Sequence, residues 1–490
     1  MLYVLVSMID DAMLDLFSKF FTQDYGNSLI IKGKPGAGKT TFALELLEHM
    51  RKQSPVYYLT TRFSEDPLIT KFPWIPEVTS GNRSRNREVH EMSEAFKGNL
   101  QNLERMIEEG RLTKGTDVKS GLVLNMAELL PELESLYSFV DQNINKAPMI
   151  VVDSIEALSE KYEIDIKLLF SIIQKDLVEA SGANIVLIME QFGDSPMEYY
   201  ADGVVTMSHD IKNNFLIRSV LVEKMRGVSI GSNPVYIYTL DNGRYHSFHR
   251  PNIKYPSGRL NPIVKKNISK MEVPLGLDEI CKLLDLDDPA LPVGTVLMLH
   301  RVGNYTSVDK VVNLIKNSLI RETLEDSRGV LDISSASNET SRIFMNCLDP
   351  ELMRFYITGE KSDRSSPYII NMNGKSMSED FPQEVIDFYM SNTNAPEVFI
   401  FSTDYLSFVY GENFYGDFLN LVNKIRSMGL VVIISDDEQY SKIFHFANYI
   451  IHLNDVYGYV TMNHDPSRLF VTTVENDKEG WPIIKLHNEV

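Results

Sequence analysis

Residues 33–40 form a glycine-rich run that follows a short apolar stretch and precedes an amphipathic one. The run matches the pattern G-x-x-x-x-G-K-[ST], in which glycines let successive backbone N–H groups curl around phosphate oxygens at a helix N-terminus. Lys39 is expected to reach the β- and γ-phosphates of ATP, and the Thr40 hydroxyl is expected to bind magnesium. The expected contacts to the nucleotide come from Gly33, Lys34, Pro35, Gly36, Ala37, Gly38, Lys39, Thr40 and Thr41.

The second expected magnesium ligand is Asp153, which ends the apolar run 149–152. In P-loop proteins a carboxylate at the end of another strand helps to hold the metal from across the sheet. Apolar strands that end in aspartate are common, so this assignment depends on the phosphate loop. Together the two motifs predict a site for ATP and Mg²⁺ in the first half of the chain.

Around these motifs, short apolar runs alternate with longer helical stretches, which is typical of a parallel sheet covered by helices. The runs 217–222 and 235–240 flank a turn region and predict an antiparallel pair at the sheet edge. A polar stretch after residue 80, followed by helical periodicity over 126–140, predicts an insertion and a helix. The other expected strands are 29–32, 56–60, 149–152, 185–189 and 203–207.

The chain has 490 residues, which exceeds the size of one ordinary hydrophobic core, so two domains are expected. We predict a P-loop domain over 1–250, a linker rich in Pro, Lys and Asn over 251–272, and a second domain over 273–490. The second half repeats the α/β pattern, with a helix at 308–319 and strands at 295–299, 330–334, 398–401 and 430–434.

Two local matches support an internal duplication. Residues 147–159 align without a gap on 395–407, and residues 200–205 align on 446–451. The chemistry is not repeated, because the run 300–307 stands where a phosphate loop is expected and lacks the Gly-Lys pair. In the gap-free alignment Phe401 replaces the metal-binding Asp153. We therefore expect the second domain to be a degenerate copy that serves a structural or partner-binding role.

Composition limits the partners and the compartment. The formal net charge of −19 repels anionic membranes and the phosphates of nucleic acids, so neither is an expected general partner. The two cysteines, Cys281 and Cys347, are too few for a disulfide framework or a cysteine zinc site, which fits a reducing cytoplasm. The cations of the predicted linker leave nucleic acid as a weaker, open alternative. They are Lys254, Arg259, Lys265, Lys266 and Lys270.

Several short motifs in the first half occur in the order found in one family. Asp153-Ser154, Glu190-Gln191, Asp202-Gly203-Val204-Val205 and Lys224-Met225-Arg226-Gly227 resemble the KaiC-like branch of the RecA-type ATPases. Within that branch, the stretches 57–62 and 71–75 look most like archaeal GvpD-type proteins, which are named for a gas-vesicle regulator. In the second half, 276–279 and 292–296 are similar to the opening segment of a KaiC-type domain.

The resemblance implies two tandem RecA-like folds, each a mostly parallel sheet covered by helices, with the second degenerate. It also implies ATP bound near a subunit boundary of a homo-oligomer, and a regulatory role that acts on protein partners through the nucleotide state. In KaiC-like rings the Lys and Arg of a Lys-x-Arg motif reach the nucleotide of the neighbouring subunit. Lys224 and Arg226 are the matching residues here, and a solvated strand end is the alternative for them.

The residues that would activate water depart from the family pattern. Members that hydrolyse ATP usually carry a glutamate pair after the second strand, where this chain has Thr61 and Arg62. Glu65 is a displaced substitute or part of an acidic loop, and Glu190 and Gln191 are alternatives that could contact the water or the γ-phosphate. ATP binding is therefore a firmer expectation than hydrolysis, which is expected to be slow.

Two other functions compete with the regulatory one. A RecA-type motor acting on DNA in recombination or repair would need basic loops, and its best support is Arg83, Arg85 and Arg87, although the acidic balance of the chain opposes it. An autokinase would need an acceptor Ser or Thr, and the sequence does not single one out.

Overall fold

The computed structural model describes residues 11–61, 131–190, 195–262, 269–303, 305–334, 344–360, 369–380, 397–436 and 441–488. Single positions inside these ranges are excepted (213, 270, 373, 378 and 412 among them), and a few isolated positions outside them are included, such as 72, 74 and 75. The chain forms two compact units, one of residues up to Phe248 and one of His249–Glu489. Each unit is described by itself below.

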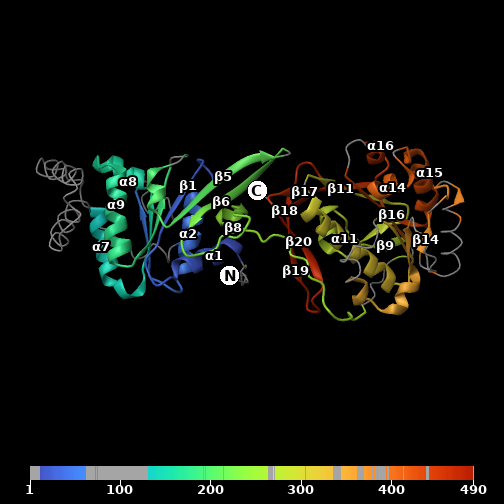
Figure 1. The fold of residues 1–490 in the computed structure, drawn as a ribbon, viewed down its shortest axis with the longest axis horizontal. Coiled ribbons are helices and arrows are strands. Elements are labelled where there is room, and N and C mark those ends of the chain that lie inside the picture. The colour runs from blue at the N-terminus through green and yellow to red at the C-terminus, as the bar shows by residue number, and fades with distance from the viewer. Residues whose placement is uncertain are drawn as a thin grey trace, which may run out of the picture. The chain divides into compact units, whose positions relative to one another are not determined.

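Unit 1 is built on an eight-stranded sheet (Figure 1). Its strands are β1 (Ser28–Gly33), β2 (Val56–Thr60), β3 (Met149–Asp153), β4 (Asn184–Ile188), β5 (Gly203–Lys212), β6 (Phe215–Met225), β7 (Val235–Thr239) and β8 (His246–Ser247). Its helices are α1 (Ala12–Phe21), α2 (Lys39–Met50), α7 (Pro131–Gln142), α8 (Ile155–Tyr162) and α9 (Ile166–Ile173). Short helical turns are η2 (Ile144–Lys146), η3 (Gln174–Ala180), η4 (Pro196–Tyr199) and η5 (Asp241–Gly243).

The strand order of this sheet is β2-β3-β4-β1-β5-β6-β7-β8. The strands from β2 to β5 are parallel, and β6, β7 and β8 are added antiparallel. Parallel strands end at a common edge, so β1 brings the phosphate loop to the same edge as the last residue of β3, Asp153. The predicted antiparallel pair is found as β6 and β7.

Alternate residues of the central strands face opposite sides of the sheet, as the two-residue period of a strand requires. Leu29 and Ile31 of β1 join a core with α1 and α2, whereas Ile30 joins a core with α7, α8 and α9. Figure 1 shows these two helical layers on either side of the strands. Side chains cap several of the helices, as Asp11 does by accepting from the backbone N–H groups of Met13 and Leu14 at 3.0 and 3.1 Å.

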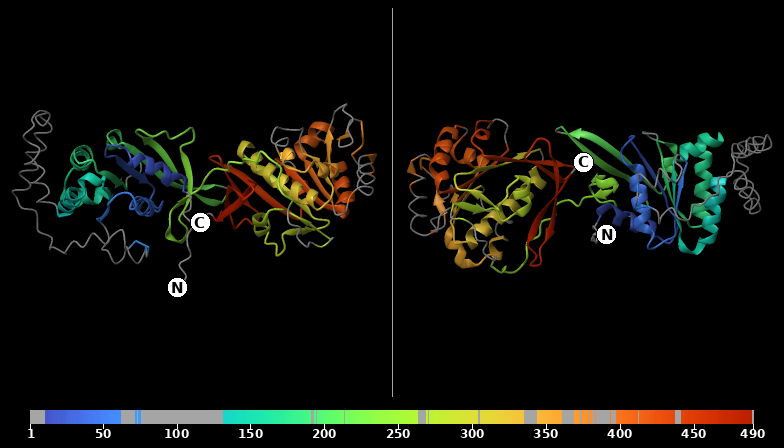
Figure 2. Two further views of the ribbon diagram at one scale, coloured as in Figure 1. Left: turned by 90° about the horizontal axis from the view of Figure 1, so that it is seen from below. Right: turned by 180° about the vertical axis from the view of Figure 1, so that it is seen from behind.

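Unit 2 has a ten-stranded sheet and a separate pair of short strands. Its strands are β9 (Glu272–Pro274), β10 (Ala290–Pro292), β11 (Val296–Val302), β12 (Val330–Ile333), β13 (Tyr356–Glu360), β14 (Ile369–Asn371), β15 (Glu397–Ser402), β16 (Gly429–Ser435), β17 (Tyr449–Val456), β18 (Tyr459–Asn463), β19 (Phe470–Asn476) and β20 (Pro482–Asn488). Its helices are α10 (Asp278–Leu283), α11 (Tyr305–Glu325), η6 (Pro350–Phe355), α14 (Thr403–Tyr410), α15 (Tyr415–Ile425), η7 (Arg426–Met428) and α16 (Ser441–Phe444). Figure 2 shows α11, in yellow, packed along the strands of this sheet.

The two sheets have the same order of core strands. In unit 2 the order is β14-β13-β12-β15-β16-β11-β17-β18-β19-β20, so β11, β12, β15, β16 and β17 correspond to β1, β2, β3, β4 and β5. The strands β18, β19 and β20 are antiparallel, as β6, β7 and β8 are in unit 1. The prediction of two tandem RecA-like α/β folds, each with a mostly parallel sheet covered by helices, is therefore confirmed.

The strand registers correct one detail of the predicted duplication. Asp153 lies beside Ile188 of β4, and the corresponding position beside Ile434 of β16 is occupied by Ser402. Phe401 lies one residue earlier and packs on the opposite face of the sheet, with α14 and α15. The gap-free alignment of 147–159 on 395–407 is thus one residue out of register, because it matched apolar character without the direction of the side chains.

Part of the stretch predicted as a linker packs on unit 2. Tyr255 accepts a hydrogen bond of 2.8 Å from the side-chain amide of Asn317, and the backbone N–H of Leu260 donates to the carbonyl of Cys347 at 3.0 Å. Within the described residues, no helix is both long and apolar enough to cross a membrane.

Candidate functional site

The phosphate loop lies between the end of β1 and the start of α2, and its backbone is shaped by glycines. At Gly33 (φ +148°) a β-carbon would lie 2.0 Å from the carbonyl oxygen of Met207 on the neighbouring strand β5, so only glycine fits. Gly36 (φ +78°) has no other heavy atom within 4 Å of the place where its β-carbon would be. Its backbone therefore offers an open approach to a ligand, as a phosphate loop requires.

The two lysines of the phosphate loop, Lys34 and Lys39, make contacts in different directions. The Lys39 ammonium reaches back across the loop and donates to the carbonyls of Gly33 at 2.8 Å and Lys34 at 3.4 Å. The Lys34 ammonium points to β5, where it pairs with Asp210 at 2.7 Å and lowers the pKa of that carboxyl. Lys39 is therefore the lysine placed over the mouth of the loop.

Thr40 and Asp153, the two predicted magnesium ligands, are in direct contact. The Thr40 hydroxyl donates to Oδ2 of Asp153 at 2.7 Å, and the Tyr58 hydroxyl donates to the same oxygen at 2.9 Å. Burial, with the Asp153 charge beside it, raises the pKa of Tyr58 well above its usual value, so this group stays a donor. Mg²⁺ commonly binds through one or two carboxylates together with substrate phosphates. One carboxylate and one hydroxyl beside a phosphate loop fit that need.

Tyr58 lies in the stretch 57–62 that carries part of the family resemblance, but it was not predicted as a site residue. A signal was available, because β2 lies next to β3 and residues two apart on a strand share a face. Thr60 pairs with Asp153 across the two strands, so Tyr58 lies on the same face of the sheet as Asp153.

Glu190 lies at the same edge of the sheet, two residues beyond the end of β4. Its Oε1 accepts from the Ser154 hydroxyl at 3.0 Å, and its backbone N–H donates to Glu156 at 2.7 Å. Ser154 directly follows Asp153, so the structure brings Glu190 close to the two predicted magnesium ligands. Ser154 and Glu156, which orient Glu190, were not predicted as site residues. Gln191 lies outside the described residues.

Thr61, which stands where ATP-hydrolysing members of the family carry a glutamate, has a structural role. The Thr61 backbone N–H donates to the carbonyl of Asp153 at 2.9 Å, and the backbone N–H of Ser154 donates to the Thr61 hydroxyl at 3.0 Å. Thr61 thus holds the backbone of Asp153 and Ser154, where the chain leaves β3. Arg62 and Glu65 are outside the described residues, as are Arg83, Arg85 and Arg87.

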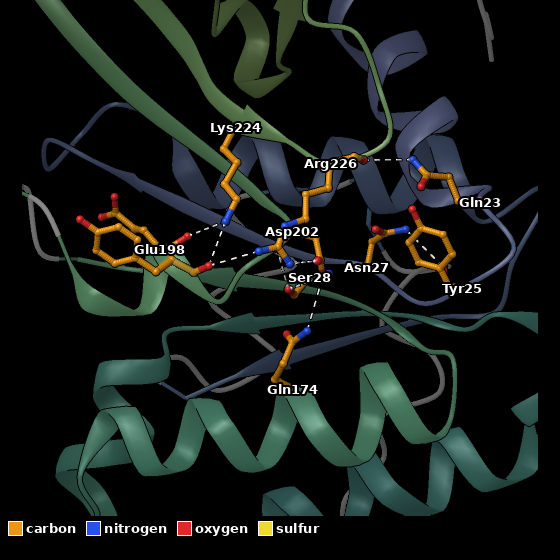
Figure 3. Close-up of polar contacts among 10 residues, drawn as sticks. Gln23, Tyr25, Asn27, Ser28, Gln174, Glu198, Asp202, Lys224 and Arg226 are labelled. Carbon is orange, nitrogen blue, oxygen red and sulfur yellow. Dashed lines mark hydrogen bonds and ion pairs between the residues drawn. The ribbon is translucent and has the colours of Figure 1, made fainter.

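Lys224 and Arg226 lie at the other end of β1 from the phosphate loop. Figure 3 shows both cations beside Asp202 and Ser28. Lys224 pairs with Val204 near the start of β5, and Arg226 binds Asp202, whose carboxylate accepts from Ser28 at the amino end of β1. The six residues of β1 rise about 16 Å between that end and Gly33. The structure therefore does not bring this pair to the phosphate loop of the same chain.

Backbone carbonyls hold both cations. The Lys224 ammonium donates to the carbonyls of Glu198 and Tyr199 at 3.0 and 3.1 Å, and Arg226 donates to that of Tyr199 at 3.3 Å. Arg226 also pairs with Asp202 at 2.9 Å, yet its side chain is 53% exposed. Burial and the nearby positive charge of Arg226 lower the pKa of Lys224. Both cations are held near the surface, and the Tyr199 residue beside them is 81% exposed.

In unit 2, an arginine lies where the phosphate loop of unit 1 begins. Residues 303–304 alone connect β11 to α11, against residues 34–38 between β1 and α2. By strand register Arg301 corresponds to Gly33, since Leu297 pairs with Tyr449 as Leu29 pairs with Gly203. The connection is too short to wrap a phosphate.

The Arg301 side chain, 13% exposed, is surrounded by three carboxylates. It pairs with Asp309 and Asp404 at 2.6 Å each, and with Asp436. Burial, and then the neighbouring Asp404, raise the pKa of Asp436 to about 7 despite the guanidinium. An internal cation and its carboxylates therefore fill this edge of the sheet, where unit 1 presents an open loop.

Two models of one family match the chain. The model described as "GvpD gas vesicle protein, P-loop domain" matches residues 17–223, and the model "GvpD basic region 2" matches residues 285–490. A solved structure of a KaiC-like protein from the archaeon Pyrococcus horikoshii matches with 21% identity and a TM-score of 0.32, over 46% of this chain and 91% of that one.

Two curated relatives come from Halobacterium salinarum. Protein GvpD2 is 24% identical over 232 residues, which is 46% of this chain and 42% of that protein. Protein GvpD1 is 28% identical over 241 residues, which is 46% of this chain and 39% of that protein. The matched region thus spans less than half the length of these relatives. Taken with the phosphate loop and the repeated RecA-like sheet, the two family models place the chain in the GvpD type of P-loop proteins.

Proposed function

We propose that the chain binds ATP with Mg²⁺ in unit 1, hydrolyses it slowly, and uses its nucleotide state to control protein partners. The observation that carries the proposal is the contact between the Thr40 hydroxyl and the Asp153 carboxylate, beside a glycine loop with Lys39 across it. These are the groups that phosphate oxygens and magnesium require, and they come from distant parts of the sequence. Bound Mg²⁺ would neutralise charge on the β- and γ-phosphates.

Each residue of the site has a part in this scheme. Backbone N–H groups of the loop and the N-terminus of α2 bind the phosphates, and the Lys39 charge faces the β- and γ-phosphates. Thr40 and Asp153 hold the metal, and Tyr58 fixes the Asp153 carboxylate through its 2.9 Å hydrogen bond. We infer that Glu190, oriented by Ser154, is the group that positions or deprotonates the attacking water.

We further propose that the protein acts as a homo-oligomer in which Lys224 and Arg226 serve the nucleotide of a neighbouring subunit. They lie a strand length from their own phosphate loop, and they are held near the surface, with Arg226 half exposed. Cations supplied in trans stabilise charge on the transferred phosphoryl group and can raise rates by ~10³ to 10⁵. Slow hydrolysis by the isolated chain follows from this arrangement.

The regulatory role is favoured over the DNA motor by charge. The stretch 285–490, which matches the family's "basic region 2", carries 16 Lys and Arg against 30 Asp and Glu in this chain. A region with a net charge of −14 repels the phosphates of DNA rather than neutralising them. We propose that unit 2 presents a surface to protein partners.

The test compares the normal protein with Lys39→Ala. ATP binding is measured by titration, hydrolysis is measured with and without single- and double-stranded DNA, and partners are captured from cells with both proteins. Nucleotide-dependent capture of a defined protein, with no stimulation by DNA, is the expected result. DNA-stimulated hydrolysis together with capture of repair proteins would replace the regulatory proposal by the motor.

A further inference from the structure

The two cations proposed to act on a neighbour are held by one short segment, residues 195–202. This segment contains η4 and precedes β5. It supplies the two backbone carbonyls that accept from Lys224 and the carbonyl and carboxylate that accept from Arg226. The position of this segment therefore determines where both cations lie.

The same segment is tied to both ends of β1, the strand that carries the phosphate loop. At the amino end, Oδ2 of Asp202 accepts from the backbone N–H and the hydroxyl of Ser28, at 3.1 and 2.9 Å. At the carboxyl end, Oε1 of Glu198 accepts from the Lys32 ammonium at 3.0 Å. The Asp202 carboxylate thus bridges Ser28 and Arg226 (Figure 3). Residue Glu198 bridges Lys32, through its carboxylate, and Lys224, through its backbone carbonyl.

Of the two contacts between residues 195–202 and β1, the one from Glu198 to Lys32 lies nearer the phosphate loop than the one from Asp202 to Ser28. Lys32 directly precedes Gly33, its side chain is 5% exposed, and it also pairs with Glu223 at 3.4 Å. Burial by itself lowers the pKa of Lys32, but the Glu198 and Glu223 carboxylates outweigh it and raise the pKa, so the ammonium stays charged. Glu198 is held from a second side by the backbone N–H of Ser195 at 2.9 Å.

We propose that Glu198 is a positioning residue that couples the chain's own phosphate loop to the Lys224 and Arg226 pair. The proposal rests on the proposed function, in which that pair serves the neighbouring nucleotide. A shift of Lys32 when phosphates bind next to Gly33 moves the Glu198 side chain, and the Glu198 and Tyr199 carbonyls move with it. Occupancy of one site then sets the position of the cations offered to the next, which makes neighbouring sites interdependent.

The coupling is tested on the full chain through the reactivity of Lys224. An amine-acylating reagent is applied with and without Mg²⁺ and ATP, and the labelling rate of Lys224 is measured by mass spectrometry against exposed Lys167 as the internal standard. Three proteins are compared: the normal chain, Glu198→Gln and Glu223→Gln. The last is the matched control, because it removes the other carboxylate beside Lys32 and leaves residues 195–202 unchanged.

In the normal chain, Mg²⁺ and ATP should change the relative labelling rate of Lys224. In Glu198→Gln, Lys224 should label about fivefold faster without ATP, because the variant replaces the charge-assisted hydrogen bond from Lys32 by a weaker neutral one and so loosens the segment that carries the Lys224 acceptors. ATP should then have no further effect, whereas Glu223→Gln should still respond to ATP. An ATP response that persists in Glu198→Gln, or a Lys224 rate that is the same in all three proteins, would overturn the coupling.

This outcome is separable from failure of the trans role. Mixed subunits that carry Lys39→Ala and Arg226→Ala report whether cations act across an interface, and they do so through ATP hydrolysis rather than labelling. An inactive mixture with an ATP-responsive Lys224 would remove the trans role and keep the coupling. An active mixture with an unresponsive Lys224 would keep the trans role and remove the coupling.

Discussion

The Thr40 hydroxyl donates a hydrogen bond of 2.7 Å to the Asp153 carboxylate, although the two residues are 113 positions apart in the sequence. The contact exists because β1 and β3 are parallel and lie on either side of β4, so that their carboxyl ends meet at one edge. It places both proposed magnesium ligands at the mouth of the phosphate loop.

Lys39→Ala should weaken ATP binding severely. The variant removes the charge that faces the β- and γ-phosphates, and one charge-assisted hydrogen bond is worth ~1.5 to 3 kcal/mol, or roughly a 10- to 100-fold change in Kd. Isothermal titration with Mg²⁺ and ATP measures the effect. Lys52→Ala, which removes an exposed lysine just beyond α2, is the control and should bind normally. Undiminished affinity in Lys39→Ala would remove the site assignment.

Tyr58→Phe should raise the Mg²⁺ concentration that ATP binding requires. The hydroxyl holds Oδ2 of Asp153 at 2.9 Å, and loss of a group that orients a metal ligand typically weakens metal affinity on the order of tenfold or more. The measurement is ATP affinity as a function of Mg²⁺ concentration. Tyr137→Phe is the control, since its hydroxyl also donates to a carboxylate at 2.9 Å, that of Asp176, elsewhere in unit 1. Equal Mg²⁺ responses in the two variants would show that Tyr58 only adds stability.

The full chain should bind one nucleotide, and Lys39→Ala should leave no stoichiometric site. Unit 2 has a two-residue connection after β11, and Arg301 with its three carboxylates fills the corresponding edge. Equilibrium dialysis with labelled ATP gives the stoichiometry. A second site that survives Lys39→Ala would contradict the prediction.

Hydrolysis should depend on assembly. Because Lys224 and Arg226 cannot reach their own phosphate loop, specific activity should rise with protein concentration. A mixture of inactive Lys39→Ala and inactive Arg226→Ala chains should regain part of the activity, since some interfaces pair an intact loop with intact cations. The trans role is wrong if the mixture stays inactive while both variants assemble, or if dilute monomer is as active as concentrated protein.

Glu397→Gln should flatten the pH dependence of unit 2 stability. Burial raises the pKa of Glu397 from its usual 4.5 to about 7. As pH rises, the unfolded chain therefore releases this proton at a lower pH than the folded chain does. Between about pH 4.5 and 7 the folded state therefore binds more protons, and the free energy of unfolding falls as pH rises, by about 3 kcal/mol at most. Above pH 7 the full free-energy cost of ionising the buried Glu397 carboxyl is present. The Glu397→Gln side chain does not ionise, so the variant removes this cost.

Urea unfolding at several pH values checks this effect. Unit 2 is followed by the fluorescence of buried Trp481, in a Trp74→Phe background that removes the other tryptophan. A normal chain and a Glu397→Gln variant with parallel pH profiles would show that the carboxyl ionises normally in the folded state.

Much of the fold could be predicted from local patterns. The apolar runs that became β1 to β5, and the runs that became β11, β12, β15 and β16, were recognisable because buried parallel strands have few polar residues. The phosphate loop was recognisable for a similar reason, since Gly33 to Thr40 form one continuous motif. Each of these signals lies within a short stretch of chain.

The remaining site residues depend on contacts between distant strands. Glu190 was among the predicted candidates, but Tyr58 and the contacts of Ser154 and Glu156 that orient Glu190 arise only through the order β2-β3-β4-β1, which no single stretch specifies. The error at Phe401 has the same origin, because an alignment of apolar residues does not record which face each side chain occupies. The pairing of Arg301 with Asp309, Asp404 and Asp436 joins β11 to α11, α14 and the end of β16. The absence of a Gly-Lys pair in the sequence therefore shows that the loop is missing but not which groups occupy its place.

The two-residue connection between β11 and α11 also bears on the history of the second unit. A substitution can restore a lysine or a glycine, but the connection would need three more residues to equal 34–38, together with the removal of Arg301 from the edge of the sheet. No single substitution achieves this, and removal of Arg301 would leave the Asp436 carboxylate, whose side chain is only 18% exposed, without its cation, which is destabilising. Unit 2 is therefore several separate changes away from a phosphate loop, and no single substitution at this edge can give it one.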